Sequence, residues 1–300
     1  MKNLLNGFRI QSDRVVGMNH RNIELILPRN ERRHFPLANN KLLTKSTLAE
    51  QGIPVSPTIT TFESFYEIGQ METRLENLNE FVVKPARGSG GNGILVISGR
   101  EGNTFFTPGG RQLTFEHLRR HIADIVFGVY SFDKVDVAVV EPRLVPNAFF
   151  ASLYPHGLSD IRLVLVDDIL SLSMLRIPTA QSDGKANLHQ GAIGIAVNVE
   201  NGLTYRAWHR RRKVSVHPEN HIPLIHQRVP SWTEVVRIAV QTARALPLKY
   251  LGVDMVIDNV LGPLVLEVNA RPGIEIQNVT GKSLLAFRQN GNLEPQGVSQ

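Results

Sequence analysis

The sequence of 300 residues contains no cysteine. Disulfide bonds, thiolate metal sites and a cysteine nucleophile are therefore excluded. No apolar run approaches the ~18 residues of a transmembrane helix, and the opening segment MKNLLNGFRI is too broken to serve as the apolar core of a secretory signal. These absences lead us to expect a soluble, cytoplasmic protein without a membrane span.

Two common catalytic patterns are also missing. No serine elbow of the form G-x-S-x-G occurs. His209, His217, His221 and His226 lie close together, but their spacing matches no metal-binding pattern. We therefore do not expect a hydrolase.

The composition is that of a globular protein with a basic bias. Apolar residues make up 42% of the chain and charged residues 20%. The 33 Lys and Arg residues exceed the 27 Asp and Glu residues, which gives a net charge of +6 and favours anionic partners. Part of the excess lies in YRAWHRRRK at 205–213, which is either a solvated loop or a surface for an acidic ligand.

Hairpins dominate the secondary structure that the sequence predicts. The expected helices are 41–51 with Gly52 as its stop, a helix opened by a capping box at 60–63 and running to about 78, a helix capped by Thr114, and a helix from a second capping box at 231–234 to Pro247. The expected strands are 81–84 with 94–97, 137–145, a hairpin at 161–178 turning at Asp167–Asp168, 193–199, and 252–258 with 263–269. Few strand–helix–strand crossovers occur, so we expect an α+β fold with antiparallel sheets.

A glycine-rich loop follows the first strong strand, in FVVKPARGSGGNGI at 81–94. The strand delivers Lys84, and four of the six residues from Gly88 to Gly93 are glycine. Glycine lets several backbone N–H groups turn toward one anion, so the loop is a candidate phosphate cradle. It is not a Walker loop, because the lysine precedes the glycines. The alternative interpretation is a flexible hairpin turn.

Three oxygen-bearing side chains fall on the last predicted hairpin. Glu267 and Asn269 are two residues apart and share a face of one strand, and Asp254 lies on the other strand. Charged groups on such apolar strands are costly unless they are paired or bound to a metal. Carboxylate and amide oxygens suit Mg²⁺. The alternative is a buried ion pair with an arginine.

A set of cations and one amide completes the candidate site. Arg162 and Arg176 lie in the predicted 161–178 hairpin, Lys185 and Asn187 in a polar loop, and Arg271 after the candidate metal strand. Each alone is explained by a surface salt bridge. Together with the glycine loop and the three oxygen donors, they indicate a site for a polyphosphate and a carboxylate.

Seven segments occur in a family-specific order: NNKLLTKSTLAEQGIPVSPT (39–58), VVKPARGSGGNGI (82–94), VVEPRL (139–144), SDIRLVLV (159–166), NLHQGAIG (187–194), GVDMVID (252–258) and LEVNARPG (266–273). This order resembles the ATP-grasp superfamily and, within it, the α-L-glutamate ligase-like proteins related to ribosomal-protein-modifying glutamate ligases. The resemblance covers residues 39–285. It implies two α+β lobes with antiparallel sheets that enclose ATP.

The resemblance also implies a role for each matching residue. ATP would be bound by Lys41 and Lys84, by a loop of Gly88, Ser89, Gly90, Gly91 and Gly93 over its phosphates, by a hinge of Glu141, Pro142, Arg143 and Leu144 at adenine, and by Asp160, Lys185 and Asn187. Asp254, Glu267 and Asn269 would hold Mg²⁺, in a pair of ions that Mn²⁺ can replace. Arg162, Arg176 and Arg271 would be the catalytic residues that hold the carboxylate and the acylphosphate.

The implied function is an ADP-forming carboxylate–amine ligase that uses glutamate or another amino acid, with an amino acid, a peptide or an acidic protein tail as acceptor. Nucleic acid is not an expected partner. A kinase of a hydroxyl substrate and a non-catalytic nucleotide-binding module are the alternatives.

The expected organisation follows from the same resemblance. It comprises a short N-terminal segment (1–40), an N-terminal lobe (41–140), a C-terminal lobe (141–288) and a disordered tail (289–300). Asn40 stands where the family has an aspartate before the first lysine. Because the family's separate N-terminal domain is missing from this sequence, a second copy or a partner chain is expected to complete the substrate site.

Overall fold

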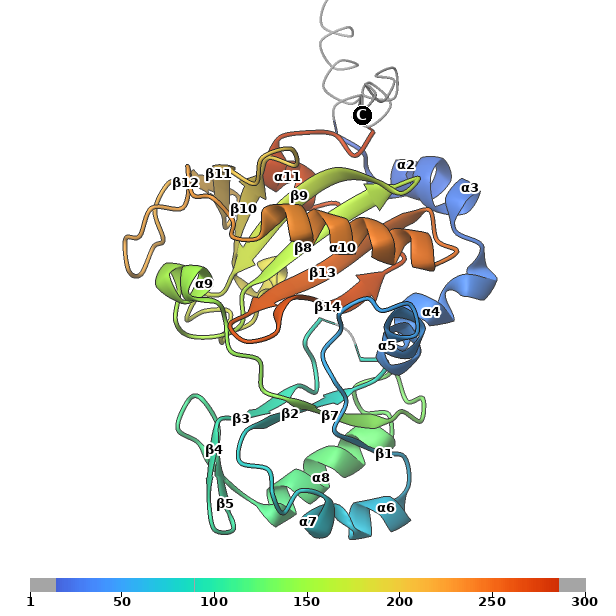
Figure 1. Cartoon of the computed structure of the whole chain (residues 1–300), viewed down its shortest axis with the longest axis vertical. Coiled ribbons are helices and arrows are strands. Elements are labelled where there is room, and N and C mark those ends of the chain that lie inside the picture. Colours follow the sequence, from blue (N-terminus) through green and yellow to red (C-terminus); the bar gives the residue numbers. More distant parts are fainter. Residues whose placement is uncertain (1–14, 89, 286–300) are drawn as a thin grey trace, which may run out of the picture.

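The computed structural model describes residues 15–88 and 90–285 of the chain. Two lobes, each with its own hydrophobic core, lie one above the other in Figure 1. The expected tail at 289–300 and Ser89 lie outside the described residues. The α+β class with antiparallel sheets, predicted from the dominance of hairpins, is confirmed.

The larger lobe is built on a seven-stranded antiparallel sheet of order β12-β11-β10-β9-β8-β13-β14. Its strands are β8 (Asp160–Val166), β9 (Ile169–Ile177), β10 (Ile193–Val197), β11 (Thr204–His209), β12 (Arg212–Val214), β13 (Tyr250–Asp258) and β14 (Gly262–Asn269). The long helix α10 (Trp232–Ala245) packs across β8, β9, β13 and β14. It buries Val235, Ile238 and Ala239, which recur at helical spacing.

Short helices surround this sheet. They are α2 (Met18–Arg21), the π-helical turn η1 (Asn22–Ile26), α3 (Leu27–Arg29), η2 (Arg32–His34), α4 (Pro36–Asn39), α5 (Lys41–Ala49), α9 (Ala148–Leu153), η3 (Leu188–Gln190) and α11 (Ile276–Thr280). Leu48 of α5 is fully buried in the core of the larger lobe. The helix that carries Lys41 therefore packs with the larger lobe, and the expected boundaries of the lobes stay a prediction.

The smaller lobe has a four-stranded sheet of order β1-β7-β2-β3 and a three-stranded sheet of order β4-β5-β6. Its elements are β1 (Thr60–Phe62), α6 (Phe65–Gly69), α7 (Met71–Arg74), β2 (Phe81–Pro85), β3 (Leu95–Ile97), β4 (Gly99–Glu101), β5 (Thr104–Phe106), β6 (Gln112–Thr114), α8 (Phe115–Val126) and β7 (Ala138–Pro142). Helix α8 lies against β2 and β7 and buries Leu118, Ile122 and Ile125. In the same core, the rings of Phe81 and Phe105 pack nearly perpendicular to each other.

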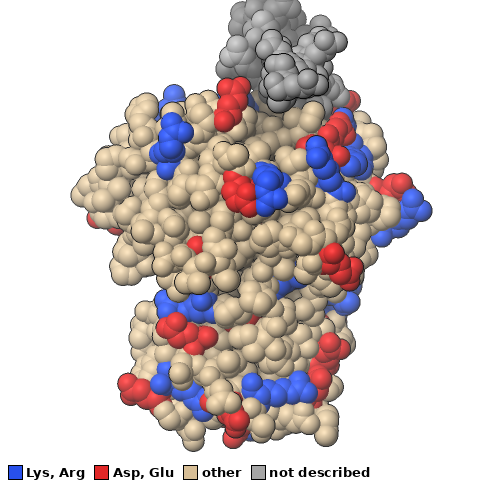
Figure 2. Space-filling model, in the orientation of Figure 1, with Lys and Arg blue, Asp and Glu red and all other residues tan. Residues whose placement is uncertain are grey.

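The chain crosses between the lobes twice. Val55 forms a bridge with Val265 of β14 on the way down to β1. After β7, Pro146 forms a bridge with Asp258, and the Asp258 carboxylate accepts a hydrogen bond of 2.7 Å from the Val145 backbone. Both crossings are thus fastened to the final hairpin of the larger lobe. The space-filling view shows a notch between the lobes on its left side (Figure 2).

Most predicted elements are confirmed, and three local predictions are wrong. The helix expected to run to about 78 is instead two short helices, α6 and α7, and ends at Arg74. Residues 60–62 form strand β1 instead of a helix cap, since Thr60 and Thr61 pair with β7. Ser64 caps the helix instead, and its Oγ accepts from the Glu67 backbone. Helix α10 begins as expected, but Ser231 has a left-handed backbone and makes no side-chain cap bond. Within the described residues, no helix combines the length and apolarity needed to cross a bilayer.

Candidate functional site

The glycine loop has the backbone that its composition predicts. Gly90, Gly91 and Gly93 have φ angles of 67°, 79° and 74°, a region that favours glycine. A Cβ at Gly93 would lie 2.6 Å from Cγ of Tyr130, so the loop also lies directly against that ring. His121 supports the same place, with its Nε2 3.0 Å from the Gly93 carbonyl oxygen. The end of the glycine loop is therefore held by the side chains of Tyr130 and His121.

The start of the loop is fixed by a buried carboxylate. The Asp136 side chain accepts a hydrogen bond of 3.0 Å from the Arg87 backbone and another from the Ser131 hydroxyl. The backbone of Lys41 also donates to the Ala86 carbonyl oxygen at 2.9 Å. Asp136 was not predicted as a site residue, because nothing in its sequence surroundings links it to a loop 49 residues earlier.

Three charged side chains form a buried cluster near the start of the glycine loop. Lys84 of β2 lies 2.8 Å from Glu141 of β7, and Lys45 of α5 lies 2.6 Å from the other oxygen of the same carboxylate. Burial alone would raise the pKa of Glu141, but the two lysines outweigh it and hold that pKa below its ordinary value. Burial lowers the pKa of Lys45, and Glu141 opposes this. One carboxylate here serves two lysines, which leaves a surplus positive charge.

A second buried cluster lies on the face of the seven-stranded sheet. Arg162 forms a two-bond ion pair with Asp254, and Arg176 forms one with Asp160 while also reaching Asp254 at 3.0 Å. Burial would raise the pKa of Asp254, but Arg162 and Arg176 lower it below its ordinary value. Burial raises the pKa of Asp160 to about 6, against the effect of Arg176. In this cluster two guanidinium groups are neutralised by two carboxylates.

Lys41 connects the glycine loop to the last hairpin. Its Nζ donates a hydrogen bond of 2.5 Å to the Gly88 carbonyl oxygen and lies 3.9 Å from the Glu267 carboxylate. Asp254 and Glu267 are register partners on β13 and β14, and the Asn269 side chain donates to Asp254 at 3.3 Å. Lys41 therefore connects the glycine loop with the hairpin that carries Asp254, Glu267 and Asn269. Burial lowers the pKa of Lys41, and Glu267 opposes this most strongly.

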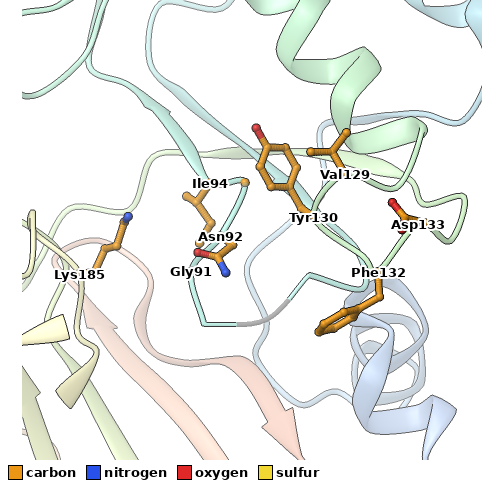
Figure 3. A pocket seen from close by; sticks show the side chains of 9 residues that line it. Gly91, Asn92, Ile94, Val129, Tyr130, Phe132, Asp133 and Lys185 are labelled. Atoms are coloured by element: carbon orange, nitrogen blue, oxygen red, sulfur yellow. The ribbon is translucent and has the colours of Figure 1, made fainter. Parts of the chain in front are cut away.

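A second contact joins the lobes farther along the loop. The amide of Asn187 donates to the Gly90 carbonyl oxygen at 3.3 Å, and Gln190 approaches the same oxygen at 3.5 Å. Lys185 lines a cavity of ≈ 410 Å³ together with loop residues such as Asn92. Figure 3 shows Lys185 on one side of the loop and Tyr130 with its neighbours on the other. Lys185 and Asn187 thus lie beside the glycine loop, and their contact with a phosphate stays a prediction.

The remaining predicted residues differ in their surroundings. Glu141 and Pro142 end β7 at the point where the chain turns to the larger lobe, and Leu144 follows there, partly exposed. Arg143 pairs with Glu80 at 2.9 Å. Arg271 is exposed, and its guanidinium lies 4.6 Å from the ring centre of Phe35. Among the described residues, Arg271 forms no ion pair with Asp160 or Asp254, the carboxylates that bind Arg162 and Arg176.

The sequence prediction missed Lys45, although a signal was present. Lys45 follows Lys41 by four residues on one helix, a spacing that places two side chains on the same helical face. Asn40 forms the cap of that helix, with its side chain accepting from the Leu42 and Leu43 backbones. The replacement of the family's aspartate therefore keeps the cap and removes one negative charge beside Lys41.

The donor set on the last hairpin is chemically suited to Mg²⁺, which prefers carboxylate and amide oxygens. Within the described residues, no group of three or more His, Cys, Asp or Glu side chains is placed to hold a metal. The candidate set contains two acids and an amide, and both Asp254 oxygens already accept from arginines. The ion pair with an arginine, which the sequence left as the alternative for Asp254, is thus present. The assignment of Asp254, Glu267 and Asn269 as Mg²⁺ ligands stays a prediction.

Residues 20–291 match the family described as sugar-transfer associated ATP-grasp. The chain belongs to this ATP-grasp family. The match covers both lobes and confirms the resemblance inferred from the order of the motifs. The two α+β lobes with antiparallel sheets are accordingly an ATP-grasp fold.

Curated relatives match a shorter stretch. A probable α-L-glutamate ligase 1 of Shewanella sp. (strain MR-4) is 33% identical over 127 residues, 42% of this chain and 31% of that protein. A probable α-L-glutamate ligase of Marinobacter nauticus is 30% identical over 129 residues, 43% of this chain and 32% of that protein. The matched stretch is thus about a third of the length of these relatives.

Solved structures match over most of the chain at low identity. The D-cycloserine synthetase DcsG has 15% identity and a TM-score of 0.44, covering 82% of this chain and 66% of that chain. The ATP-grasp ligase PsnB with a minimal precursor has 13% identity and a TM-score of 0.47, covering 88% and 62%. The D-alanine–D-alanine ligase of Bacillus anthracis has 14% identity and a TM-score of 0.41, covering 79% and 58%.

Proposed function

We propose that this ATP-grasp protein is an ATP-dependent, ADP-forming carboxylate–amine ligase with glutamate or another amino acid as a substrate. The observation that carries the proposal is Lys41, which contacts the glycine loop at Gly88 and approaches Glu267 beside Asp254. The candidate phosphate loop and the candidate metal donors thereby both lie next to Lys41. The family membership and the relatives named as probable glutamate ligases support it.

ATP fits this place by charge. Lys41, Lys45 and Lys84 converge near the loop, and Glu141 and Glu267 balance only part of their charge. Backbone N–H groups of left-handed glycines add further donors for phosphate oxygens. Glu141, the first residue of the proposed hinge Glu141–Leu144, pairs with Lys45 and Lys84, and the adenine end of ATP is proposed to lie at this hinge.

The proposed reaction has two steps. The substrate carboxylate attacks the γ-phosphorus of ATP, and ADP leaves with the electron pair of the broken P–O bond. An amine then attacks the acyl carbon of the acylphosphate, phosphate leaves, and the amine loses a proton as the amide forms. Most of the protein's contribution to such a reaction is positioning and charge neutralisation.

Individual side chains have distinct proposed tasks. Glu267 and Asn269 would hold Mg²⁺, joined by Asp254 if its arginine pairs rearrange, and bound Mg²⁺ would neutralise charge on the phosphates. Arg162 and Arg176 would contact a carboxylate and a transferred phosphoryl group, and Asp160 would keep Arg176 in place when Asp254 turns to Mg²⁺. The glycine loop, joined to the larger lobe through Asn187, would exclude water from the reactive intermediate. Arg271 remains a proposed contact at the edge of this site.

An ADP-release screen tests the proposal. The purified full chain is incubated with Mg²⁺–ATP and pools of amino acids and short peptides, and products are identified by mass spectrometry. A ligase yields ADP, phosphate and a new amide. Hydroxylamine in place of the amine should trap a hydroxamate, whereas a kinase would give a phosphorylated hydroxyl compound. ATP binding without phosphate release in every pool would indicate a non-catalytic module.

Glu267→Gln provides the site-specific test. The change keeps the side-chain size and removes the charge proposed for Mg²⁺, so ADP release should fall by about 100-fold or more while the fold is retained. Glu234→Gln, in an exposed helical pair with Arg237, is the matched control and should leave the rate unchanged. Full activity of the purified Glu267→Gln protein would contradict the site assignment.

A further inference from the structure

A second cavity, of ≈ 260 Å³, lies on the larger lobe outside the residues assigned above. Trp208 of β11, Arg210 and Arg211 of the following turn, and Glu275 before α11 line it together with part of segment 188–192. We call this cavity the Trp208 pocket. It combines a flat indole ring, two guanidinium groups and one carboxylate, none of which has a task in the proposed reaction.

The Trp208 pocket is separated from the arginine cluster. Trp208 is the register partner of Gly194, and Gly194 is the register partner of Arg176, so the pocket and the cluster lie on one face of the sheet. Val279 and Leu188 cover that face at Gly194, where they lie 2.5 Å and 3.4 Å from the position a Cβ would take. A ligand in the pocket is therefore kept away from the reacting groups, and the pocket has to be explained by binding alone.

The turn that supplies the two arginines has an unusual backbone. Arg210 and Arg211 form the two-residue loop of the β11–β12 hairpin, and their φ angles are 47° and 63°. Asn-Gly is the sequence that such a loop favours, since a positive φ at both positions strains other residues. Strained backbone of this kind persists at ligand sites, where the side chains that it presents are needed. The turn therefore indicates a binding role for the two guanidinium groups.

The charged groups of the pocket do not neutralise one another. Within the described residues, neither Arg210 nor Arg211 forms an ion pair. The partners of these groups are neutral amides: Arg210 Nε donates to the Gln181 side chain at 2.6 Å, and the Glu275 carboxylate accepts from Asn278 at 2.9 Å. Both arginines are exposed, whereas Glu275 is half-buried. The carboxylate thus lies deeper in the protein than the two cations.

These groups together fit a nucleotide. An indole ring stacks on a base, and guanidinium groups bind phosphate through paired N–H donors. A carboxylate only accepts hydrogen bonds, so it pairs with the N1–H and the N2 amino group of guanine, whereas adenine presents an unprotonated N1 that repels it. The cavity is close to the lower limit of about 300 Å³ for ligand pockets, so it takes one base and leaves the phosphates at its mouth.

We propose that the Trp208 pocket binds a free guanine nucleotide as a regulatory ligand. The base packs on the indole of Trp208 with its donor edge on Glu275, and the phosphates lie at Arg210 and Arg211. ATP is disfavoured in this pocket, because adenine lacks the second donor. The site is separate from the proposed ligase reaction and does not depend on it.

The segment that lines the pocket also contacts the glycine loop. Leu188 and His189 line the pocket, while the side chains of Asn187 and Gln190 lie 3.3 Å and 3.5 Å from the Gly90 carbonyl oxygen. Asn187 also accepts a hydrogen bond of 3.0 Å from the His189 backbone. A base in the pocket would hold this segment where it contacts the loop. The guanine nucleotide and ATP should therefore strengthen each other's binding by the same factor.

Isothermal titration calorimetry on the full chain tests the pocket. Mg²⁺ and a non-hydrolysable ATP analogue are kept at saturation, so that the proposed ATP site is filled and only a second site is measured. Guanosine monophosphate (GMP) and guanosine diphosphate (GDP) are the probes. Adenosine monophosphate (AMP), which lacks the donor edge, and guanosine, which lacks phosphate, are the matched comparisons. We expect GMP or GDP to bind about tenfold more tightly than both, since each lost charged contact weakens binding about that much.

Three variants locate the binding. Arg211→Gln should weaken GMP binding by about tenfold or more. Glu275→Gln should shift the preference from GMP toward AMP, because an amide offers adenine both a donor and an acceptor. A merely structural role of Glu275 would not produce that shift. Arg212→Gln is the matched control, because Arg212 carries the same charge on the same hairpin and does not line the pocket.

Each outcome supports or overturns a stated part of the assignment. Absence of GMP and GDP binding to the saturated protein, or equal affinity in Arg211→Gln and Arg212→Gln, would overturn the pocket. An unchanged preference for GMP in Glu275→Gln would overturn the position of the base. Tighter binding of a 5′-phosphorylated oligoribonucleotide that begins with guanine would overturn the free nucleotide as the ligand and assign the pocket to an RNA end.

The link to the glycine loop has its own measurement. A fluorescent ATP analogue should bind more tightly when GMP is present, and unchanged or weaker binding would overturn the coupling. The ADP-release screen decides the ligase proposal separately. If no amide is ever formed but GMP binds through Arg211, the ligase proposal fails and the nucleotide site stands. If amide forms and GMP does not bind, the ligase proposal stands and the nucleotide site fails.

Discussion

The two buried charge clusters use opposite arrangements. Below the glycine loop, the single carboxylate of Glu141 faces Lys45 and Lys84. On the large sheet, Arg162 and Arg176 face Asp160 and Asp254. The lysine cluster keeps a surplus positive charge, while the arginine cluster is neutral. The first is suited to attract a polyphosphate, and the second to hold planar donors at fixed positions.

The largest effect on stability is expected from a substitution that breaks the arginine cluster. Asp254→Ala removes the carboxylate shared by Arg162 and Arg176 and leaves a buried positive charge. Such a loss lowers the free energy of unfolding by about 3–5 kcal/mol. Urea denaturation of the purified protein measures it. Asp167→Asn, at a partly exposed pair with Arg29, is the control: it removes the charge and keeps a residue type that tolerates the left-handed backbone there, so it should change stability by less than about 1 kcal/mol. A similar small change for Asp254→Ala would mean that the cluster is not closed to water.

The next effect removes a charge from the lysine cluster. Lys84→Ala leaves Glu141 paired with Lys45, so the fold should persist. ADP release should fall by about 10²–10³-fold, because a preorganised charge at the phosphates is lost. The rate under saturating Mg²⁺–ATP and the thermal midpoint are measured together. Lys249→Ala, at a surface pair with Asp168, controls for charge and should keep full activity.

The lysine cluster also predicts a pH dependence. Lys84 and Lys45 hold the folded-state pKa of Glu141 below its ordinary value despite burial. The stability that this carboxylate contributes is therefore complete above the ordinary glutamate pKa of about 4.3 and is lost as the pH falls through the lowered folded-state value.

The test of this dependence compares wild type with Glu141→Gln across pH 7 to 3 by urea denaturation. At pH 7 the variant should be less stable by about 1–3 kcal/mol, since hydrogen bonds to a charged group are lost. The difference should shrink as the solution is acidified below the ordinary pKa of glutamate. A difference that stays constant to the lowest pH would show that the Glu141 charge contributes nothing.

Some secondary-structure elements could be predicted from the sequence and others could not, and the difference has a physical cause. Alternating apolar residues and the turn at Asp167–Asp168 predicted the β8–β9 hairpin, because both the turn and the register are local properties. Thr60–Phe62 failed as a helix cap, because pairing with β7, far along the chain, outweighs a four-residue pattern. Local sequence patterns therefore predicted the structure correctly where the partner strand is the next one along the chain.

The site shows the same division. The need for glycine at Gly90, Gly91 and Gly93 was predictable, since it depends on backbone geometry alone. The pairing of Arg162 with Asp254 joins residues 92 positions apart and depends on the order of strands in the sheet. Residue types indicated charge neutralisation, whereas the identity of each partner required the three-dimensional structure.

The smallest predicted effect concerns the loop above the lysine cluster. Gly93 has a φ angle of 74°, and a Cβ there would lie 2.6 Å from the Tyr130 ring. Gly93→Ala should therefore lower stability by about 1–2 kcal/mol from backbone strain and displace the loop. Gly99→Ala is the matched control, because its Cβ would meet nothing within 4 Å and its φ is not in the left-handed region. Nucleotide affinity, measured with a fluorescent ATP analogue, should fall for Gly93→Ala and not for Gly99→Ala. If both variants bind nucleotide like wild type, the end of the loop at Tyr130 is not part of the phosphate cradle, and the lysine cluster alone would have to account for nucleotide binding.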